Sequence, residues 1–291
     1  VDQTFTINQA SLVITASSAT VDYGDPVPTI TPSYSGFVYG QSAVNLSTAP
    51  TCATTYVTSS NAGSTPTTSC SGAAADNYSI SYVPGSVTIN QVSVSITAAS
   101  FSLTYGDAVP TVTASYSGFV NGQDSTALST LPTCSTTYTP TSNAGTTPST
   151  SCSGAAATNY TFTYTNGSVT IAKATPTFGW SNVSKTYGDS AYAITAPTAS
   201  VAGSFGYGSS APGVISISGS TATVAGAGSA TITATFTPTD ATNYVSGGTV
   251  TQTVTVAKAA ATVTAADQSV AYSTSASTVT GNGSVTYGLV N

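Results

Sequence analysis

Four cysteines are the most reactive side chains of this 291-residue chain, and they form two pairs with the same spacing. Cys70 follows Cys52 by 18 positions, and Cys152 follows Cys134 by 18. A zinc site favours Cys-x-x-Cys spacing or added histidine, and the chain has neither. The spacing therefore predicts one disulfide in each pair. A disulfide closing a loop of this size stabilises a fold by about 3 kcal/mol and indicates an oxidising, extracytoplasmic compartment.

A repeated tripeptide supplies the aspartates that could bind a metal ion. It occurs as Tyr23-Gly24-Asp25, Tyr105-Gly106-Asp107 and Tyr187-Gly188-Asp189. Calcium takes six to eight oxygen ligands, usually from clustered carboxylates, whereas the second copy has Thr104 where the first has Asp22. An aspartate beside glycine commonly stabilises a turn by accepting hydrogen bonds from its own backbone. We expect structural turns at these positions and no metal.

The composition excludes most catalytic chemistry. The chain has no histidine, its nine acidic residues are all aspartate, and its three basic residues are all lysine. It lacks an imidazole base, a glutamate acid and a guanidinium group, so we expect no enzyme, no catalytic residue and no cofactor. The net charge of −6 and the absence of arginine disfavour nucleic acid and anionic membrane surfaces as partners. No apolar run reaches the ~18 residues of a membrane-spanning helix.

The surface could carry sugars. Six Asn-x-Ser/Thr sequons begin at Asn45, Asn77, Asn159, Asn166, Asn182 and Asn282. A chain this rich in serine and threonine also generates sequons by chance. Because only 4% of residues are charged, an uncoated surface has little repulsion to prevent association. We therefore expect either glycosylation or self-association into fibres.

The 17 tyrosines could stack on sugar rings, as in a lectin. However, Tyr34 and Tyr78 recur in register as Tyr116 and Tyr160, and recurrence indicates a structural role. The Asn-Tyr tyrosines resemble the tyrosine corner of immunoglobulin-like sandwiches. A lectin-like site would instead predict an aromatic cluster in one repeat only. The single tryptophan, Trp180, is expected in core or inter-domain packing.

These residues belong to a repeat of about 82 positions. Besides the tripeptide and the cysteines, the recurring segments are Tyr34-Ser35-Gly36-Phe37 with Tyr116-Ser117-Gly118-Phe119, and Asn61-Ala62-Gly63 with Asn143-Ala144-Gly145. The Asn77-Tyr78 pair recurs at residues 159–160 and again at residues 243–244. The repeat predicts a closing strand of a preceding repeat at 1–9, repeats at 10–91, 92–173 and 174–258, and a partial repeat at 259–291.

Within each repeat the hydrophobic pattern has a period of two, as in Thr249–Val256, which predicts β-strands. Turn residues such as Asp25-Pro26, Pro84-Gly85 and Asn166-Gly167 recur every 8–12 positions, which favours small sandwiches of antiparallel strands. Because the last strand of each repeat runs directly into the first strand of the next, we expect the tandem repeats to form an extended rod.

These motifs resemble a known family, the MBG domain of the Tyr-Gly-x type, which consists of bacterial immunoglobulin-like surface repeats. The resemblance covers nearly the whole of the first and second repeats. The third and fourth repeats lack the cysteine pair and Tyr-Ser-Gly-Phe, and they look like more generic bacterial immunoglobulin-like repeats. The resemblance implies tandem arrays in large exported adhesins and other proteins at the bacterial cell surface.

The sequence therefore predicts an all-β protein that acts as a non-catalytic stalk of an exported surface protein. Its expected partners are neighbouring repeats of the same chain. One alternative is a subunit of an extracellular filament, assembled by end-to-end contacts or by strand addition at sheet edges. Another is a lectin-like adhesive module that binds surface glycans.

Overall fold

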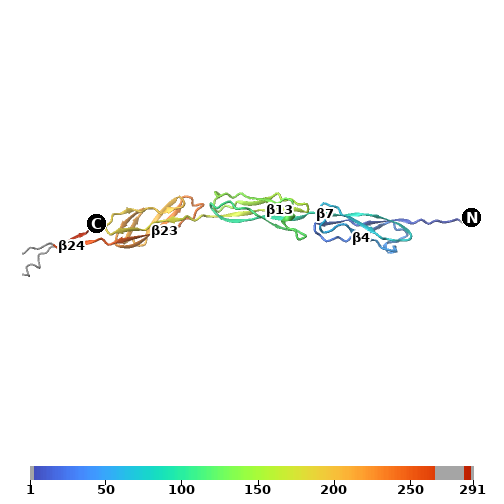
Figure 1. Ribbon diagram of the computed structural model, residues 1–291, viewed down its shortest axis with the longest axis horizontal. Helices are drawn as coiled ribbons and strands as arrows, with labels where there is room; N and C mark the ends of the chain where they lie inside the picture. The colour runs from blue at the N-terminus through green and yellow to red at the C-terminus, as the bar shows by residue number, and fades with distance from the viewer. Residues whose placement is uncertain (1–2, 266–284, 290–291) are drawn as a thin grey trace, which may run out of the picture. The chain divides into compact units, whose positions relative to one another are not determined.

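The structure is a computed structural model that describes residues 3–265 and 285–289. Strands dominate it, with two single-turn 3₁₀ helices at Ala43–Asn45 and Ser125–Ala127 (Figure 1). None of the helical segments in the described ranges is long and apolar enough to cross a bilayer. By internal contacts the chain divides into two compact units. Unit one comprises residues 1–102, 108–139 and 147–170, and unit two comprises residues 103–107, 140–146 and 171–291.

The first repeat is a two-sheet sandwich. One sheet has the order β3-β1-β6, with β1 at Ala10–Ala16, β3 at Pro32–Ser35 and β6 at Tyr78–Val83. The other has the order β2-β7-β5-β4, with β2 at Ala19–Asp22, β4 at Thr51–Thr54, β5 at Thr67–Ser71 and β7 at Gly85–Asn90. Figure 1 labels β4 and β7. The fully buried side chains of Leu12 and Ile14 alternate along β1 with less buried ones, as expected for a strand with one face toward a core.

The second repeat has the same two sheets. The first has the order β10-β8-β13, with β8 at Val92–Ala98, β10 at Ala114–Ser117 and β13 at Tyr160–Thr165. The second has the order β11-β12-β14-β9, with β9 at Phe101–Thr104, β11 at Thr133–Thr136, β12 at Ser149–Ser153 and β14 at Gly167–Ala172.

The sandwiches combine antiparallel strand pairs with parallel ones, which the spacing of the turns does not predict. β1 pairs with β6 in parallel and β2 pairs with β7 in parallel, and β8 with β13 repeats this arrangement. Pro84-Gly85 is where the chain passes from one sheet to the other, and it closes no hairpin between β6 and β7. The equivalent Asn166-Gly167 lies between β13 and β14 in the same way. Gly85 is required there because an added Cβ would lie 2.8 Å from the carbonyl oxygen of Ala16.

The third repeat is built from nine strands of unequal length. Its main sheet has the order β16-β23-β22-β19, with β16 at Val183–Thr186, β19 at Gly203–Ser209, β22 at Gly228–Pro238 and β23 at Thr249–Ala257. The facing sheet has the order β17-β21-β20, with β17 at Tyr192–Ala193, β20 at Ile215–Ser218 and β21 at Thr221–Val224. A short pair joins β15 (Phe178–Gly179) to β18 (Thr198–Ala199). Beyond this repeat, β24 (Ala261–Ala265) pairs with β25 (Val285–Leu289).

Candidate functional site: the junctions between repeats

Each Tyr-Gly-Asp tripeptide forms a tight turn. The amide of Asp25 donates to the carbonyl oxygen of Asp22 over 3.0 Å, and the carboxylate of Asp25 accepts from the amide of Asp22 over 2.9 Å. Gly24 has a φ of 91°, the left-handed conformation that favours glycine at the third position of such a turn. The turns at Asp107 and Asp189 make the same pair of bonds, with Thr104 and Thr186 in place of Asp22. Each aspartate thus serves its own turn.

Within the described part of the chain, the aspartates do not gather into a metal site. Among residues 3–265 and 285–289, no group of three or more histidine, cysteine, aspartate or glutamate side chains lies close enough together to hold an ion.

The tyrosine of the tripeptide lies at the boundary with the next repeat. Tyr23 is buried, and its ring packs edge-on against Tyr160 of the second repeat at a centroid distance of 5.7 Å. Tyr105 meets Tyr244 of the third repeat in the same way at 5.5 Å. Both contacts pair a Tyr-Gly-Asp tyrosine with an Asn-Tyr tyrosine of the following repeat. Tyr187, the third member of the set, is 51% exposed.

Two asparagines form an amide pair across each of these boundaries. Asn159 of the second repeat donates through Nδ2 to Oδ1 of Asn61 over 3.1 Å, and its Oδ1 accepts the amide of Ala62 over 2.9 Å. Asn243 of the third repeat makes the same two bonds, to Asn143 over 3.1 Å and from the amide of Ala144 over 2.8 Å. We call Asn61 with Asn159, and Asn143 with Asn243, the junction amide pairs.

The linker is also fixed at each boundary. Gln91 donates through Nε2 to the carbonyl oxygen of Thr158 over 2.9 Å, and Lys173 donates through Nζ to that of Ala241 over 2.6 Å. At the first boundary Val92, which follows Gln91, donates its backbone amide to the carbonyl oxygen of Asn159 over 3.1 Å. The linker is therefore held by hydrogen bonds to the segment that carries the junction asparagine.

A third contact at the first junction requires a glycine. An added Cβ on Gly24 would lie 2.8 Å from Cγ2 of Val120, so the turn and the loop of the second repeat approach closely. In the same loop Asn121 donates through Nδ2 to the carbonyl oxygen of Thr58 over 3.0 Å. Gly106, the equivalent in the second repeat, has no atom within 4 Å of an added Cβ.

The tyrosine of each Asn-Tyr pair holds this loop in place. The Tyr160 hydroxyl accepts the amide of Val120 over 3.3 Å and donates to Oε1 of Gln123 over 2.6 Å. Tyr78 bonds Val38 and Gln41 in the same way. Burial raises the pKa of Tyr160, because the neutral phenol tolerates an apolar environment better than the phenolate does. The hydroxyl ties the start of a strand to a turn, as the tyrosine-corner resemblance implies.

The four cysteines form Cys52–Cys70 and Cys134–Cys152 disulfides. Each bridge joins directly opposite residues of neighbouring strands, β4 with β5 and β11 with β12. Cys70 and Cys152 are buried in the cores of their sandwiches. Each bridge therefore links the edge strand of a sheet, β4 or β11, covalently to the strand beside it.

The sequons lie in different environments. Asn159 uses both of its amide atoms in the junction, so a glycan there would compete with the amide pair. Oδ1 of Asn45 accepts a hydrogen bond from the amide of Ser42, and Oδ1 of Asn182 accepts one from the amide of Thr253. Asn77 and Asn166 have exposed side chains. Asn282 lies outside the described residues.

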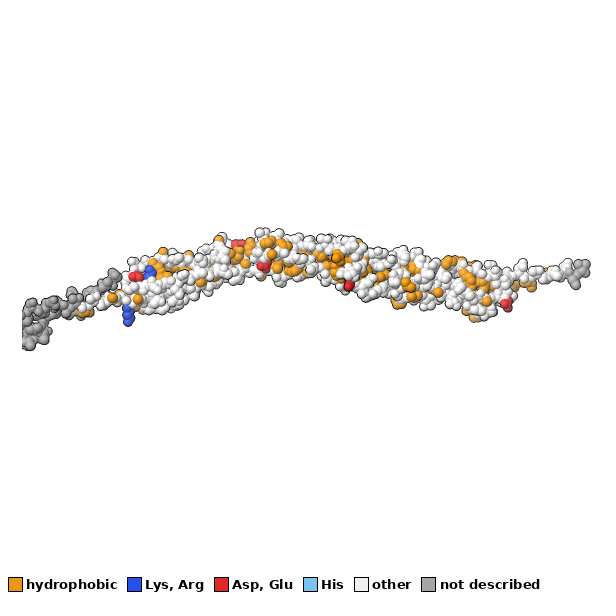
Figure 2. Space-filling model, in the orientation of Figure 1, with side chains coloured by type: hydrophobic (Ala, Val, Ile, Leu, Met, Phe, Trp, Pro, Cys, Tyr) orange, Lys and Arg blue, Asp and Glu red, His pale blue; other side chains and the backbone are white. Residues whose placement is uncertain are grey.

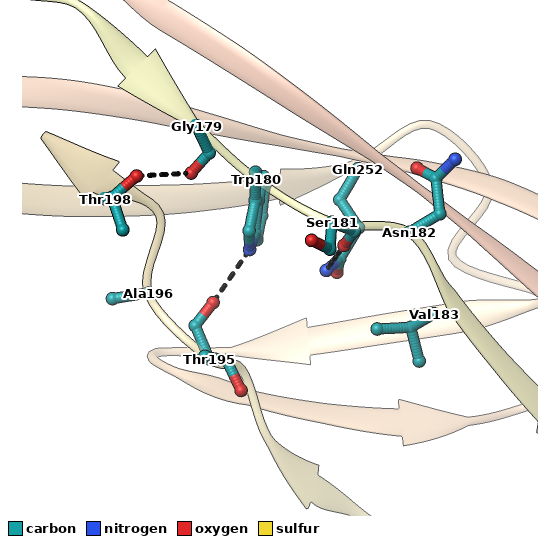
Figure 3. Close-up of a pocket in the computed structure, with 9 residues that line it drawn as sticks. All are labelled: Gly179, Trp180, Ser181, Asn182, Val183, Thr195, Ala196, Thr198 and Gln252. Carbon is teal, nitrogen blue, oxygen red and sulfur yellow. Dashed lines mark hydrogen bonds between the residues drawn. The ribbon is translucent and has the colours of Figure 1, made fainter.

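The third repeat has an aromatic cluster of its own. Phe178, Phe205 and Phe236 pack together with centroid distances of 5.0 to 5.8 Å. Trp180 packs on Tyr207 and donates through Nε1 to the carbonyl oxygen of Thr195 over 2.8 Å (Figure 3). A hollow of about 480 Å³ lies beside the indole and is lined by neutral residues only.

Sequence comparison decides the family. The sequence profile of the MBG domain (YGX type) matches residues 12–88 and 94–170, which together make up more than half of the chain. The chain belongs to the MBG domain (YGX type) family. Its two MBG repeats are the two that carry the disulfides and the Asn-Ala-Gly turns.

A comparison of the MBG chain with the curated proteins found no match. Among solved structures, mouse cadherin-23 EC22-24 is 14% identical with a TM-score of 0.27, over 86% of this chain and 99% of that chain. Sidekick-1 immunoglobulin domains 1–5 are 8% identical with a TM-score of 0.26, over 85% and 60%. The I9-I11 tandem of titin is 7% identical with a TM-score of 0.21, over 87% and 98%. At these values the likenesses carry no inference about activity or partners.

The junction amide pairs were missed by sequence reasoning. The recurrence of Asn61-Ala62-Gly63 as Asn143-Ala144-Gly145 was a signal that these positions matter in each MBG repeat. The partner of Asn61 lies 98 positions away in the next repeat, and no local pattern indicates it.

Proposed function

We propose that the protein is a non-catalytic spacer of an exported surface protein, in which neighbouring repeats are coupled at their junctions into a stiff array. One observation carries this proposal: the same amide pair, tyrosine pair and linker hydrogen bond recur at the junctions of the second repeat with the first and with the third. Repeats joined by a flexible linker would not be expected to make the same contacts at successive junctions.

The energetics favour coupling over free rotation. Each junction amide pair makes two hydrogen bonds, and each hydrogen bond contributes about 1 kcal/mol net. The tyrosine pair adds about 0.5–1.5 kcal/mol beyond the area it buries. Rotation at a junction must break these contacts together, so their contributions add in favour of the fixed arrangement.

The disulfides and the low charge suit an extracellular location. Disulfides persist in oxidising compartments, and each one here holds an edge strand to its sheet. Charged side chains are few on the face seen in Figure 2, so screening by salt changes few interactions. A spacer at a cell surface benefits from both properties.

A lectin-like module is the second candidate, and the hollow beside Trp180 in the third repeat favours it. An indole at the edge of a hollow with neutral polar lining is a surface on which a sugar ring could stack. Trp180 is the only tryptophan, so its fluorescence reports directly on that hollow. A shift of the Trp180 emission on titration with neutral oligosaccharides would support this candidate, and an unchanged emission would contradict it.

Electron imaging of the purified chain, with non-reducing mass analysis, tests the spacer. We expect separate stiff particles with lengths set by the number of repeats, and a mass four hydrogens below that of the reduced chain. Ordered filaments with a fixed axial repeat would favour a filament subunit instead. Particles that bend freely at the junctions would contradict the spacer.

A further inference from the structure

The first junction is made by two separate segments of the first repeat. One is the Tyr-Gly-Asp turn, whose Tyr23 ring packs on Tyr160 of the second repeat. The other is the loop between β4 and β5, residues 55–66, which carries Asn61 and Ala62 and which we call the docking loop. The two segments are far apart in the sequence. Both can fit the second repeat only if their relative position is fixed.

The side chain of Tyr56 joins the docking loop to the turn. Its hydroxyl donates to the carbonyl oxygen of Asp25, 31 positions away, over 2.7 Å. The other polar groups of Asp25 already serve the turn, because its amide donates to Asp22 and its carboxylate accepts from the amide of Asp22. The Tyr56 hydroxyl therefore bonds the remaining polar group of the aspartate that closes the turn.

The ring of Tyr56 is held as firmly as its hydroxyl. The residue is 2% exposed and belongs to a cluster of buried side chains that continues from Tyr23 and Ile89 of the first repeat to Ile96 and Tyr160 of the second. A close-packed ring has little freedom to move, so its hydroxyl holds the turn at a defined place. A phenylalanine would fill the same space without the donor.

The docking loop has two arms that are fixed in different ways. The arm that follows Tyr56 reaches the second repeat at Thr58, whose carbonyl oxygen accepts from Nδ2 of Asn121 over 3.0 Å. The other arm carries Ala62, and the amide of Gly63 donates to a carbonyl oxygen of β7 over 3.0 Å. The Tyr56 hydrogen bond therefore supports the arm that contacts Asn121 and the turn that contacts the next repeat.

The same tyrosine recurs where the junction recurs. Tyr138 follows Tyr56 at the spacing of the repeat, in the equivalent loop 137–148, and it is also 2% exposed. In the third repeat the same spacing reaches Ser220, in the short turn between β20 and β21. The sequence of the third repeat has no Asn-Ala-Gly segment either. The buried tyrosine and the Asn-Ala-Gly turn thus occur together, in the two MBG repeats.

We propose that Tyr56 in the first repeat, and Tyr138 in the second, are the positioning residues of the junctions. Each fixes the Tyr-Gly-Asp turn against the docking loop, so that the two segments present one surface to the next repeat. The Tyr56 hydroxyl acts through the turn, since its hydrogen bond stays within the first repeat. This inference rests on the proposed coupling role of the junctions.

Tyr56→Phe removes the hydroxyl and keeps the ring, so the core of the first repeat stays filled. Nuclear magnetic resonance of the full oxidised chain compares this variant with the wild type. We expect the Nδ2 protons of Asn121 to exchange about fivefold faster, because the loop arm that they bond has lost one hydrogen bond. The nuclear Overhauser effects between the rings of Tyr23 and Tyr160 should weaken as the turn loosens.

Tyr138→Phe is the matched control at the second junction. It should leave the first junction unchanged and weaken the nuclear Overhauser effects between the rings of Tyr105 and Tyr244. This crossed pattern separates positioning from plain stabilisation. A loss of stability confined to the first repeat would not change the exchange of Asn121, which belongs to the second repeat.

Two results would overturn the proposal. The first is a Tyr56→Phe chain that is less stable but keeps wild-type exchange at Asn121 and a wild-type contact between the rings of Tyr23 and Tyr160. Tyr56 would then serve its own repeat only. The second is an equal effect of either tyrosine variant on both junctions, because the hydroxyls would then act on overall stability.

A second measurement leaves Tyr56 unchanged. If the Tyr56 hydrogen bond favours the docked junction by some factor, docking favours that bond by the same factor. Asn159→Ala, which breaks the first junction amide pair, should therefore speed exchange of the Tyr56 hydroxyl proton and leave that of Tyr138 unchanged. An unchanged Tyr56 proton would contradict the inference even if Tyr56→Phe failed to fold.

The wild-type chain separates this inference from the proposed function. Free exchange of the Ala62 and Ala144 amides in the wild type would contradict the proposed function itself, since both amides donate across a junction. Protection of both amides, with no effect of Tyr56→Phe at the first junction, would contradict this inference alone.

Discussion

The asparagine of the Asn-Tyr motif shows how one residue type acquires different roles from its surroundings. Asn77 is exposed, Asn159 bonds Asn61 across a junction, and Asn243 is buried and bonds both Asn143 and Asp240. A primary amide suits this position because it donates and accepts at once without a charge to desolvate. At a junction, this asparagine therefore forms hydrogen bonds to the preceding repeat as well as contributing to the fold of its own repeat.

Replacing the junction asparagine should uncouple the first two repeats. Asn159→Ala removes both hydrogen bonds of the junction amide pair, the one to Asn61 and the one from the amide of Ala62, so we expect the free energy of unfolding to fall by about 1–3 kcal/mol. Asn77→Ala is the matched control, with an expected change within about 0.5 kcal/mol because the side chain is exposed. Urea unfolding of both variants measures the difference. Equal effects would remove the special role of Asn159.

Two glycines provide a second matched pair. Gly24 and Gly106 both have a φ of 91°, but only Gly24 has a neighbour that an added Cβ would meet, Val120. Gly106→Ala should cost about 1–2 kcal/mol, the penalty of a left-handed residue with a side chain. Gly24→Ala should cost about 1–3 kcal/mol more, because the first junction must open to admit the methyl group. Thermal unfolding compares them, and equal losses would mean that the first junction is not closely packed at Gly24.

At the scale of elements, the strands were predictable and their pairing was not. The period of two in Thr249–Val256 corresponds to β23, because alternating burial leaves a local signature. Pro84-Gly85 has the local chemistry of a hairpin turn, yet it lies where the chain changes sheets. The parallel pairing of β2 with β7 joins residues 68 positions apart, as in the hydrogen bond from Asn90 to Asp22. A pattern read along one strand cannot contain that information.

The disulfides make an internal comparison possible. Reduction should lower the stability of the first and second repeats by about 3 kcal/mol each, since each bridge closes a loop of similar size. The third repeat has no cysteine and should be unchanged. Hydrogen exchange with and without reductant resolves the three repeats in one sample. Loss of protection in the third repeat as well would show that its stability depends on its neighbours.

At the scale of the whole molecule, the scarcity of titratable groups predicts an unusually flat pH profile. The chain has no histidine, and its cysteines are in disulfides, so no side chain changes charge near neutrality. Burial raises the pKa of Tyr56, Tyr160 and Tyr207. A raised pKa of an acid means that the folded state holds its proton more tightly. The stability from these tyrosines is therefore complete below about pH 10 and is lost as pH rises through their folded pKa values.

We expect the unfolding temperature to stay constant from about pH 5 to 9 and to fall above about pH 10. At the acid end, hydrogen bonds from Thr126 lower the pKa of Asp124, so its contribution is present above about pH 4 and is lost as pH falls. Calorimetry across this range measures the profile. A steep slope between pH 6 and 8 would contradict it.

The central claim is that the junction contacts hold neighbouring repeats in fixed relative orientations. Small-angle X-ray scattering of the oxidised chain, beside an Asn159→Ala and Asn243→Ala double variant with unchanged circular dichroism, tests it most directly. The account predicts that one rigid arrangement of the repeats fits the wild-type curve and that the double variant requires a broad ensemble. A wild-type curve that already requires a broad ensemble, and that the double variant reproduces, would contradict the account.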